Sequence, residues 1–269
     1  MILESLFIAF SIGASLNTAS EDNSISLMTH YQVPRTVGRN GWVSVEKEVS
    51  WKTSETAIII VDMWDKHWSW GATERVGIMA PRMNFVIKSA REKGITIIHA
   101  PSDTMDFYKN HPARLNALSV PLVTPPDPID HDDPPQPVDS SDGGSDTGEA
   151  SSYKAWYRQH PAIEIDDMDF ISDNGQEVYN VLAQKGIKNL IYMGVHTNMC
   201  VLGRSFAIKQ MVRWGLNVVL ARDLTDAMYN PYKPPYVSHE EGTRLIIEYI
   251  EKFWCPTILS SDLTTPEPK

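Results

Sequence analysis

Residues 189–208 read NLIYMGVHTNMCVLGRSFAI, and the rest of the chain is organised around them. Residues 190–193 form a short apolar run, which is typical of a strand buried on both faces of a parallel sheet. Gly194 ends that run. From Cys200 onward, apolar and polar residues alternate at helical spacing up to Gly215, a common C-terminal stop. We therefore predict a strand, a turn and a helix that begins at Cys200.

The position of Cys200 allows two interpretations. Unpaired amides and the positive end of a helix dipole favour a thiolate, which is the nucleophilic form of cysteine. Many free cysteines, however, are simply small buried hydrophobic residues. The position alone does not separate a reactive cysteine from a structural one.

The residues around Cys200 carry a family resemblance. The segment GVHTNMCVLGRSFAIKQMVRWGLNVVLARDLTDA resembles the nucleophile region of the isochorismatase-like cysteine hydrolases, which include nicotinamidases, N-carbamoylsarcosine amidohydrolase and biuret hydrolase. The matching positions are Gly194, Val195, Thr197, Cys200, Val201 and Asp223. This resemblance favours the catalytic interpretation of Cys200.

The composition of the chain indicates its domain size and argues against some classes of binding partner. A chain of 269 residues with 42% hydrophobic residues fits one large domain with a sizeable core. A net charge of -10 without a basic stripe argues against a nucleic-acid partner. The two cysteines, Cys200 and Cys255, form neither a disulfide framework nor a metal-ligand spacing.

The first 50 residues are predicted to be a tail or signal segment followed by an extended arm. Residues 6–14, LFIAFSIGA, are too few to span a bilayer, so no membrane partner is expected. They resemble a signal-peptide core, but no Lys or Arg precedes them, which leaves both a cytoplasmic and an exported location open. Residues 31–51 contain a Gly-Arg-Asn-Gly turn between alternating segments, which predicts a hairpin or a pair of extended arms.

The strongest strand signal is TAIIIVD at residues 56–62, an apolar and β-branched run that ends in Asp62. A carboxylate at the C-terminal end of a central parallel strand lies where open α/β sheets bind ligands. The loop that follows contains Trp64, Lys66, His67 and Trp68. We predict that its tryptophans and histidine line a substrate pocket rather than a solvated loop.

Strands and helices alternate along residues 51–262, which are predicted to be one hydrolase domain. Further strands are expected at 95–100, 162–166, 190–193, 217–223 and 257–259, and helices at 75–94, 106–118, 174–186, 200–215 and 239–253. This alternation predicts an α/β fold of three layers, α-β-α, with a six-stranded, mostly parallel sheet of order 3-2-1-4-5-6. The Pro, Asp, Gly and Ser content of residues 120–152 predicts an irregular insertion or lid, and residues 263–269 a disordered tail.

The resemblance implies a catalytic set of Asp, Lys and Cys. Asp62 matches the acid and Cys200 the nucleophile, and the predicted sheet order brings them together. The backbone amides of His196 and Cys200 are implied as the oxyanion hole, with a cis peptide between Val195 and His196. The neighbouring Thr197 and Asn198 are assigned to the substrate pocket.

The family lysine is missing from this sequence. Counting back from Cys200 places it near Asp167, in an acidic string that contains no lysine. We predict that another cation replaces it, with Lys66 as the first candidate and Arg158 or Lys154 as the next. Glu164 or Asp167 facing the cysteine would instead favour a non-catalytic protein.

The metal site that the resemblance implies for nicotinamidases is also broken. Asp103 is followed two positions later by Met105 instead of a histidine. His99, Asp103 and His111 could still form a ligand set, but loop and core roles are the expectation. We therefore predict no metal and no cofactor.

Together these features predict a cysteine-dependent hydrolase that cleaves amide-type C–N bonds of a small molecule through a thioester. Two alternatives remain: a vinyl-ether hydrolase of the isochorismatase type, which needs no cysteine, and a non-catalytic small-molecule-binding protein on the same fold. The expected partners are a small-molecule substrate and further copies of the chain in a homo-oligomer.

Overall fold

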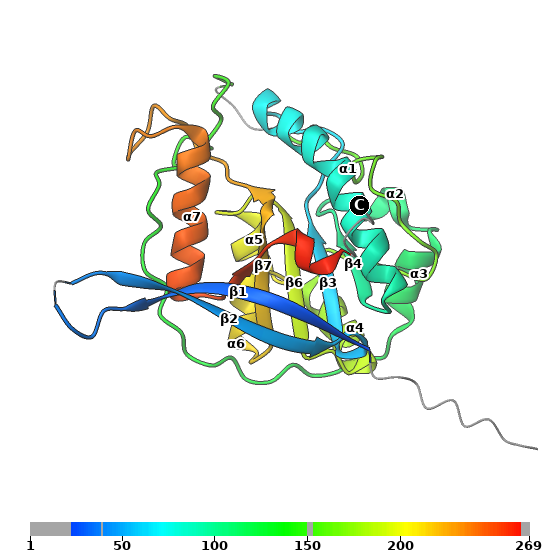
Figure 1. Ribbon diagram of the computed structural model, residues 1–269. Helices are drawn as coiled ribbons and strands as arrows, with labels where there is room; N and C mark the ends of the chain where they lie inside the picture. The colour runs from blue at the N-terminus through cyan, green and yellow to red at the C-terminus, as the bar shows by residue number, and fades with distance from the viewer. Residues whose placement is uncertain (1–22, 39, 150–152, 265–269) are drawn as a thin grey trace, which may run out of the picture.

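The computed structural model describes residues 23–38, 40–149 and 153–264. An eight-stranded sheet of order β2-β1-β8-β7-β6-β3-β4-β5 forms its centre (Figure 1). The parallel strands are β3 (Thr56–Val61), β4 (Thr96–Ala100), β5 (Phe170–Ile171), β6 (Asn189–Val195), β7 (Asn217–Asp226) and β8 (Thr257–Ile258). Their order, β5-β4-β3-β6-β7-β8, is the predicted 3-2-1-4-5-6.

The third strand of this series lies later in the chain than predicted. The sequence suggested residues 162–166, whereas β5 comprises only Phe170 and Ile171, which pair with Ile98 and His99 of β4. Two paired residues give almost no alternating pattern, so the more apolar start of the preceding segment misled the sequence analysis.

The helices differ in length, and the longer ones begin at side chains that cap them. They are α1 (Trp70–Glu92), α2 (Met105–Tyr108), α3 (Pro112–Ser119), α4 (Gly175–Lys185), α5 (Cys200–Gly203), α6 (Ile208–Arg213) and α7 (His239–Phe253). Asn174 caps α4 by accepting two backbone N–H groups, and Gly186 ends it in the left-handed conformation. Ser238 caps α7 by accepting the backbone N–H of Glu241. No helix in the described part of the chain is long and apolar enough to cross a membrane.

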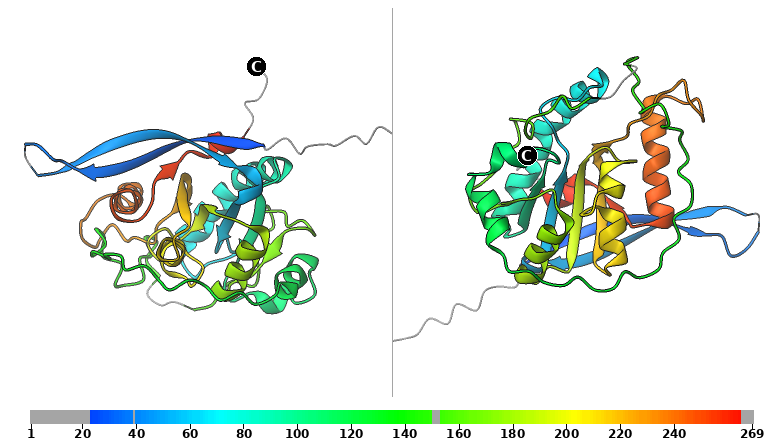
Figure 2. Two further views of the ribbon diagram at one scale, coloured as in Figure 1. Left: turned by 90° about the horizontal axis from the view of Figure 1, so that it is seen from below. Right: turned by 180° about the vertical axis from the view of Figure 1, so that it is seen from behind.

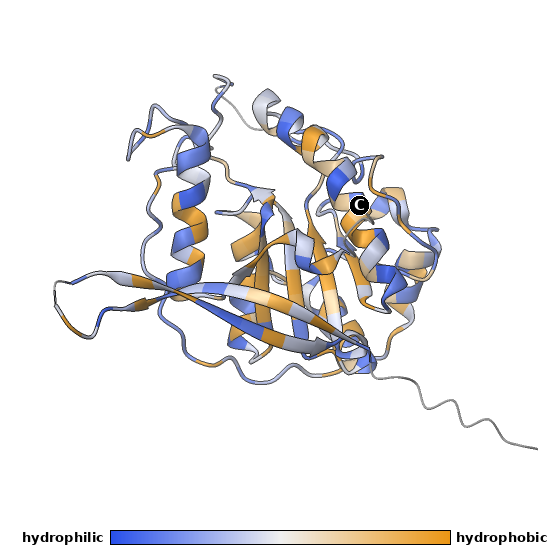
Figure 3. Ribbon diagram, viewed as in Figure 1, coloured by the Kyte–Doolittle hydropathy of each residue, from blue (hydrophilic) through white to orange (hydrophobic). Residues whose placement is uncertain are grey.

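The sheet separates two hydrophobic cores. Along β3, Ile58 and Ile60 face the core shared with α1, while Ile59 and Val61 face the core shared with α4 to α7. This alternation buries the strand on both faces, as the apolar run predicted. Figure 2 shows the resulting three layers, and Figure 3 shows the apolar strands of the sheet beside helices in which apolar and hydrophilic residues alternate.

The N-terminal arm is an antiparallel hairpin that extends the same sheet. It consists of β1 (Ser24–Pro34) and β2 (Trp42–Lys52), and β1 joins β8 through the pair His30 and Thr257. The far end of the hairpin projects beyond the helices (Figure 1). The signal-like residues 6–14 lie outside the described residues.

The described part of the insertion, residues 120–149, contains no helix or strand and runs as a strap across the α4 to α7 side (Figures 1 and 2). The Gln136 side chain donates to the Asn198 carbonyl (2.9 Å), and Lys209 donates to Asp133 (2.6 Å). Gly144 lies so close to Met228 that an added Cβ would come within 2.4 Å of its carbonyl oxygen. The strap therefore packs against the body of the domain. Its function as a lid stays a prediction.

The helix predicted from Cys200 to Gly215 is broken into two short helices. α5 ends at Gly203, Arg204 has an extended backbone, and α6 begins only at Ile208. This break changes the direction of the chain immediately after the cysteine.

Candidate active site

Asp62 lies directly after β3 in an unusual backbone conformation. Its φ is 46°, in the left-handed region, and its side chain is fully buried. One carboxylate oxygen accepts the backbone N–H of Ser102 (2.7 Å), which follows β4. Burial raises the pKa of the Asp62 carboxyl, and the Arg204 charge, the Cys200 thiol and Ser102 oppose that rise.

Gly194 brings the ends of β3 and β6 into close contact. Its φ is 118°, and an added Cβ would lie 2.1 Å from the carbonyl oxygen of Val61. Only glycine fits this position without moving the backbone. The chain leaving β6 can therefore return beside Asp62, where Cys200 begins α5.

The Cys200 thiol is protonated at neutral pH. Burial, followed by the charge of Asp62, raises its pKa to about 12, while Arg204 and the backbone N–H of His196 act in the opposite direction. The thiolate expected from the helix N-terminus is therefore not the resting state. α5 has only four residues, and its dipole does not outweigh burial next to a carboxylate.

Arg204 is the cation of this site. Its Nε lies 3.3 Å from an Asp62 carboxylate oxygen, and its Nη2 lies 3.8 Å from Asp103. It stands four residues after Cys200, so even a broken helix returns it to the same side. That i, i+4 spacing was the sequence signal that could have identified Arg204, which our candidates omitted.

The cations proposed from the sequence lie elsewhere, so the prediction of Lys66 was wrong. Lys66 is exposed and forms no ion pair among the described residues. The Lys154 amine donates to the Asp103 carbonyl (2.5 Å), and Arg158 lies over the ring of Phe107. The sequence could not show that the chain bends at Gly203 and returns Arg204 to Asp62.

The acidic residues of the third-strand region do not face the cysteine either. Glu164 pairs with Lys88 on α1 (3.2 Å), and Asp167 is exposed. The positions directly after β5 are Ser172 and Asp173, and the Asp173 carboxylate accepts the Asp103 N–H (2.8 Å). The acids that were expected to disfavour catalysis are thus engaged away from Cys200.

The two backbone amides that were predicted to form an oxyanion hole belong to His196 and Cys200. The peptide bond between Val195 and His196 is cis, as the resemblance implied. Within the described residues, neither the His196 amide nor the Cys200 amide donates to an oxygen atom, while the next amide, of Thr197, donates to Asp226 (2.9 Å). The His196 amide instead interacts with the Cys200 sulfur, so it lies beside the nucleophile. Binding of an oxyanion by the His196 and Cys200 amides stays a prediction.

A comparison of the sequence with protein-family models identifies the family of this chain. The family model described as isochorismatase domain matches residues 56–233. The chain belongs to the isochorismatase family of hydrolases. No curated protein matches it in a sequence comparison.

Several solved protein structures are similar to this isochorismatase-family chain at low sequence identity. A cysteine hydrolase from Pseudomonas syringae pv. phaseolicola has 16% identity and a TM-score of 0.49, over 78% of this chain and 91% of that chain. A pyrazinamidase of Pyrococcus horikoshii in complex with zinc has 18% identity and a TM-score of 0.43, over 76% and 99%. An N-carbamoylsarcosine amidase from Thermoplasma acidophilum has 13% identity and a TM-score of 0.40, over 77% and 96%.

Thr197 and Asn198 support the nucleophile loop, and their assignment to the substrate pocket stays a prediction. The Thr197 hydroxyl lies 2.7 Å from that of Thr225 on β7. The Asn198 side chain bonds both the N–H (2.8 Å) and the carbonyl (2.9 Å) of Met228. These polar side-chain atoms are committed to the neighbouring strand and the loop that follows it.

The loop after Asp62 forms an aromatic cluster next to the nucleophile loop. The ring of Trp64 stacks on Trp156 with centroids 4.1 Å apart, and His67 contacts Trp68 (5.2 Å) and the His196 ring (4.9 Å). Burial lowers the pKa of His67 to about 4 and that of His196 to about 3, so both rings are neutral at pH 7. Trp156, which the sequence analysis did not select, joins this cluster from beyond the insertion.

The residues of the expected metal region do not fit a metal ion. Both ring nitrogens of His99 are engaged, by Gln159 (3.1 Å) and Asp169 (3.0 Å). Asp103 pairs with Arg204, and His111 caps α3. No group of three or more His, Cys, Asp or Glu among the described residues is arranged as a metal site. Catalysis without a metal stays a prediction.

Proposed function

We propose that this isochorismatase-family protein hydrolyses amide-type C–N bonds of a small molecule through a thioester on Cys200. The observation that carries the proposal is the convergence of Asp62, Cys200 and Arg204 at the carboxyl ends of β3 and β6. A carboxylate, a thiol and a cation in contact supply a base, a nucleophile and a charge that stabilises the ionised base.

The first step begins from the protonated thiol. Asp62 accepts the proton of Cys200 as the sulfur attacks the carbonyl carbon of the substrate, and the carbonyl oxygen becomes an oxyanion. The amides of His196 and Cys200 stabilise that oxyanion. Concerted proton transfer is needed because the thiol pKa of about 12 leaves little thiolate at neutral pH.

The second half of the reaction returns the site to its starting state. The tetrahedral intermediate collapses, the C–N bond breaks, and protonated Asp62 gives its proton to the leaving nitrogen. A water molecule then attacks the thioester while Asp62 accepts one of its protons. Collapse of this intermediate releases the carboxylic acid and restores the Cys200 thiol.

Arg204 has an electrostatic role in this scheme. A guanidinium does not deprotonate in proteins, so it cannot shuttle protons as an amine can. It favours the ionised form of Asp62 in a buried position and partly offsets the repulsion between carboxylate and developing thiolate. Proton transfer therefore depends on Asp62 alone.

The site also bears on the two alternatives. Isochorismatase-type vinyl-ether hydrolysis needs no cysteine, whereas here the Cys200 thiol is hydrogen-bonded to Asp62 and to the His196 amide. The non-catalytic alternative rested on the missing lysine, and Arg204 supplies a cation at Asp62. The aromatic cluster next to the nucleophile loop fits a planar substrate group.

Ammonia release from a panel of small amides and ureides tests the proposal. We expect turnover by the natural sequence and a loss of at least about 1,000-fold in Cys200→Ala, because a unit of nucleophile and base fails when one member is removed. Cys255→Ala is the matched control and should retain turnover, because Cys255 lies on the far side of the domain. Substantial turnover by Cys200→Ala would contradict the thioester, and no turnover of any panel member would favour a non-catalytic protein.

A further inference from the structure

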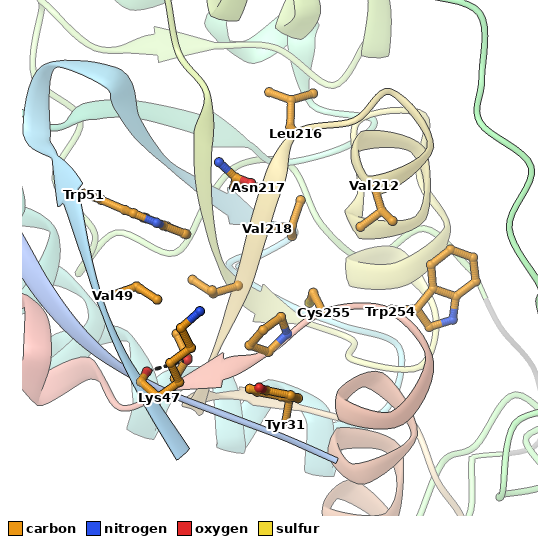
Figure 4. A pocket seen from close by; sticks show the side chains of 13 residues that line it. Tyr31, Lys47, Val49, Trp51, Val212, Leu216, Asn217, Val218, Trp254 and Cys255 are labelled. Atoms are coloured by element: carbon orange, nitrogen blue, oxygen red, sulfur yellow. Dashed lines mark hydrogen bonds between the residues drawn. The ribbon is translucent and has the colours of Figure 1, made fainter. Parts of the chain in front are cut away.

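A cavity lies at the opposite end of the parallel strands from Cys200. Its volume is about 430 Å³, within the range of small-molecule sites. Figure 4 shows its lining: Thr29, Tyr31, Lys47, Val49, Trp51, Val212, Leu216, Asn217, Val218, Val219, Trp254, Cys255 and Pro256. Asn217 pairs with Asn189 at the start of β6, whereas the nucleophile loop follows the end of that strand. A seven-residue strand, roughly 20 Å, therefore separates the two sites.

The cavity exists because β8 is too short to fill the sheet. β8 pairs with β7 only at Leu220 and Ala221, and with β1 only at His30. Beside residues 217–219 of β7, the chain instead turns from α7 into β8 at Cys255 and Pro256. The inner face of the hairpin forms the opposite wall.

The walls carry aromatic and aliphatic side chains together with the polar Thr29 and Asn217, and a single lining residue is charged. Lys47 extends from β2 into the space bounded by Trp51, Tyr31 and Cys255 (Figure 4). Within the described residues, the Lys47 amine and the Tyr31 hydroxyl have no ion-pair or hydrogen-bond partner. A free ammonium and a free hydroxyl are thus available beside flat apolar surfaces.

Neighbouring cations do not duplicate the charge of Lys47. Lys209 and Arg213 on α6 lie over the ring of Trp254, but both pair with Asp133, at 2.6 and 3.9 Å. The chain as a whole carries a net charge of -10 and therefore repels anions at long range. Selection of an anion at this cavity would depend on Lys47.

We propose that this cavity binds a small organic anion with a flat apolar body, of the aryl carboxylate class. The body would pack against Trp51 and the valine side chains, and the carboxylate would accept hydrogen bonds from Lys47 and Tyr31. Burial of the aromatic body provides affinity, and the ammonium selects the charged acid over its neutral amide. This site is separate from the one that contains Cys200.

Calorimetric titration with 2-naphthoate and with its neutral isostere 2-naphthamide tests this site. In the natural sequence we expect naphthoate to bind at least about tenfold more tightly than naphthamide, equivalent to 1.4 kcal/mol. Lys47→Met should abolish that preference, and Lys47→Arg should retain most of it. The control Lys109→Met removes another exposed lysine and should change neither affinity. The same titration in Cys200→Ala should be unchanged, which separates binding at this cavity from binding at the catalytic site.

Several results would overturn the proposal. Equal affinity for the acid and the amide would show that Lys47 does not select charge, as would an unchanged preference in Lys47→Met. Absence of naphthoate binding at millimolar concentration would show that the cavity is not a site for this class. A concentration-dependent dimer that Trp51→Ala dissociates would identify the cavity as a contact between copies of the chain instead.

Discussion

Replacing Arg204 with methionine removes the positive charge next to Asp62 while keeping much of the side-chain volume. Two unit charges 3.3 Å apart attract by about 5 kcal/mol at an effective dielectric constant of about 20. The Arg204 side chain is 35% exposed, so solvent screening reduces the useful part to about 2–3 kcal/mol. We therefore expect Arg204→Met to lower kcat/KM by about 30- to 150-fold.

The pH dependence of kcat/KM distinguishes this electrostatic effect from a structural defect. Asp62 must be ionised to accept the thiol proton, so activity falls as the pH drops through its pKa. Burial already raises the pKa of Asp62, and Arg204 opposes that rise. Loss of the cation raises the pKa further, so the acidic limb of the profile should move to higher pH in Arg204→Met. Arg204→Lys should restore part of the rate and of the original profile.

Lys66→Met is the matched control, because Lys66 is a nearby but exposed cation that our sequence analysis had favoured. Its kcat/KM and pH profile should equal those of the natural sequence. The reasoning would be refuted if Arg204→Met retained full kcat/KM, or if it lost activity without a shift of the acidic limb. A loss in Lys66→Met would return the catalytic cation to the residue that the sequence suggested.

Three further predictions concern the same site. Asp62→Asn should abolish turnover yet speed the labelling of Cys200 by iodoacetamide, because the Asp62 carboxylate raises the pKa of the thiol. Mass spectrometry measures the labelling rate, and slower labelling would contradict this prediction. Gly194→Ala should lower Tm by about 10 °C or more in a thermal melt, because the added Cβ would overlap the Val61 carbonyl. A Tm within about 2 °C of that of the natural protein, a loss of unfolding free energy of about 1 kcal/mol, would contradict the close approach. Activity should survive treatment with EDTA. If the purified protein contained stoichiometric zinc or iron, and EDTA removed both the metal and the activity until metal was added back, the interpretation of His99 and its neighbours would be wrong.

The sequence determined the order of the six parallel strands, but not that the N-terminal hairpin extends the sheet to eight strands. Strong local patterns at TAIIIVD and at residues 190–193 specified two doubly buried strands, and the right-handed crossover rule then gave the observed order of the six parallel strands. Asp62 and Cys200 could be placed together for the same reason, because adjacent parallel strands end at one edge of a sheet. The periodicity of apolar residues and the handedness of strand connections follow from local properties of the chain, so both can be predicted from the sequence.

Short elements and bends depended on tertiary contacts. β5 has two residues and is fixed by its pairing with β4, not by its own pattern. The break after Gly203, which turns Arg204 toward Asp62, has no strong local signal in a segment that reads as one helix. The sequence therefore showed that the family lysine is missing, and the spacing from Cys200 could have made Arg204 a candidate, but only the fold shows that Arg204 contacts Asp62.

The electrostatic state of the cysteine was likewise decided in three dimensions. From the sequence, a helix N-terminus favoured a thiolate, because only the dipole of that helix was visible. The folded chain encloses Cys200 with the carboxylate of Asp62, and burial beside that charge raises the thiol pKa to about 12. Sequence alone specifies which groups are present, whereas the pKa of each group depends on the solvent and charges that the fold places around it.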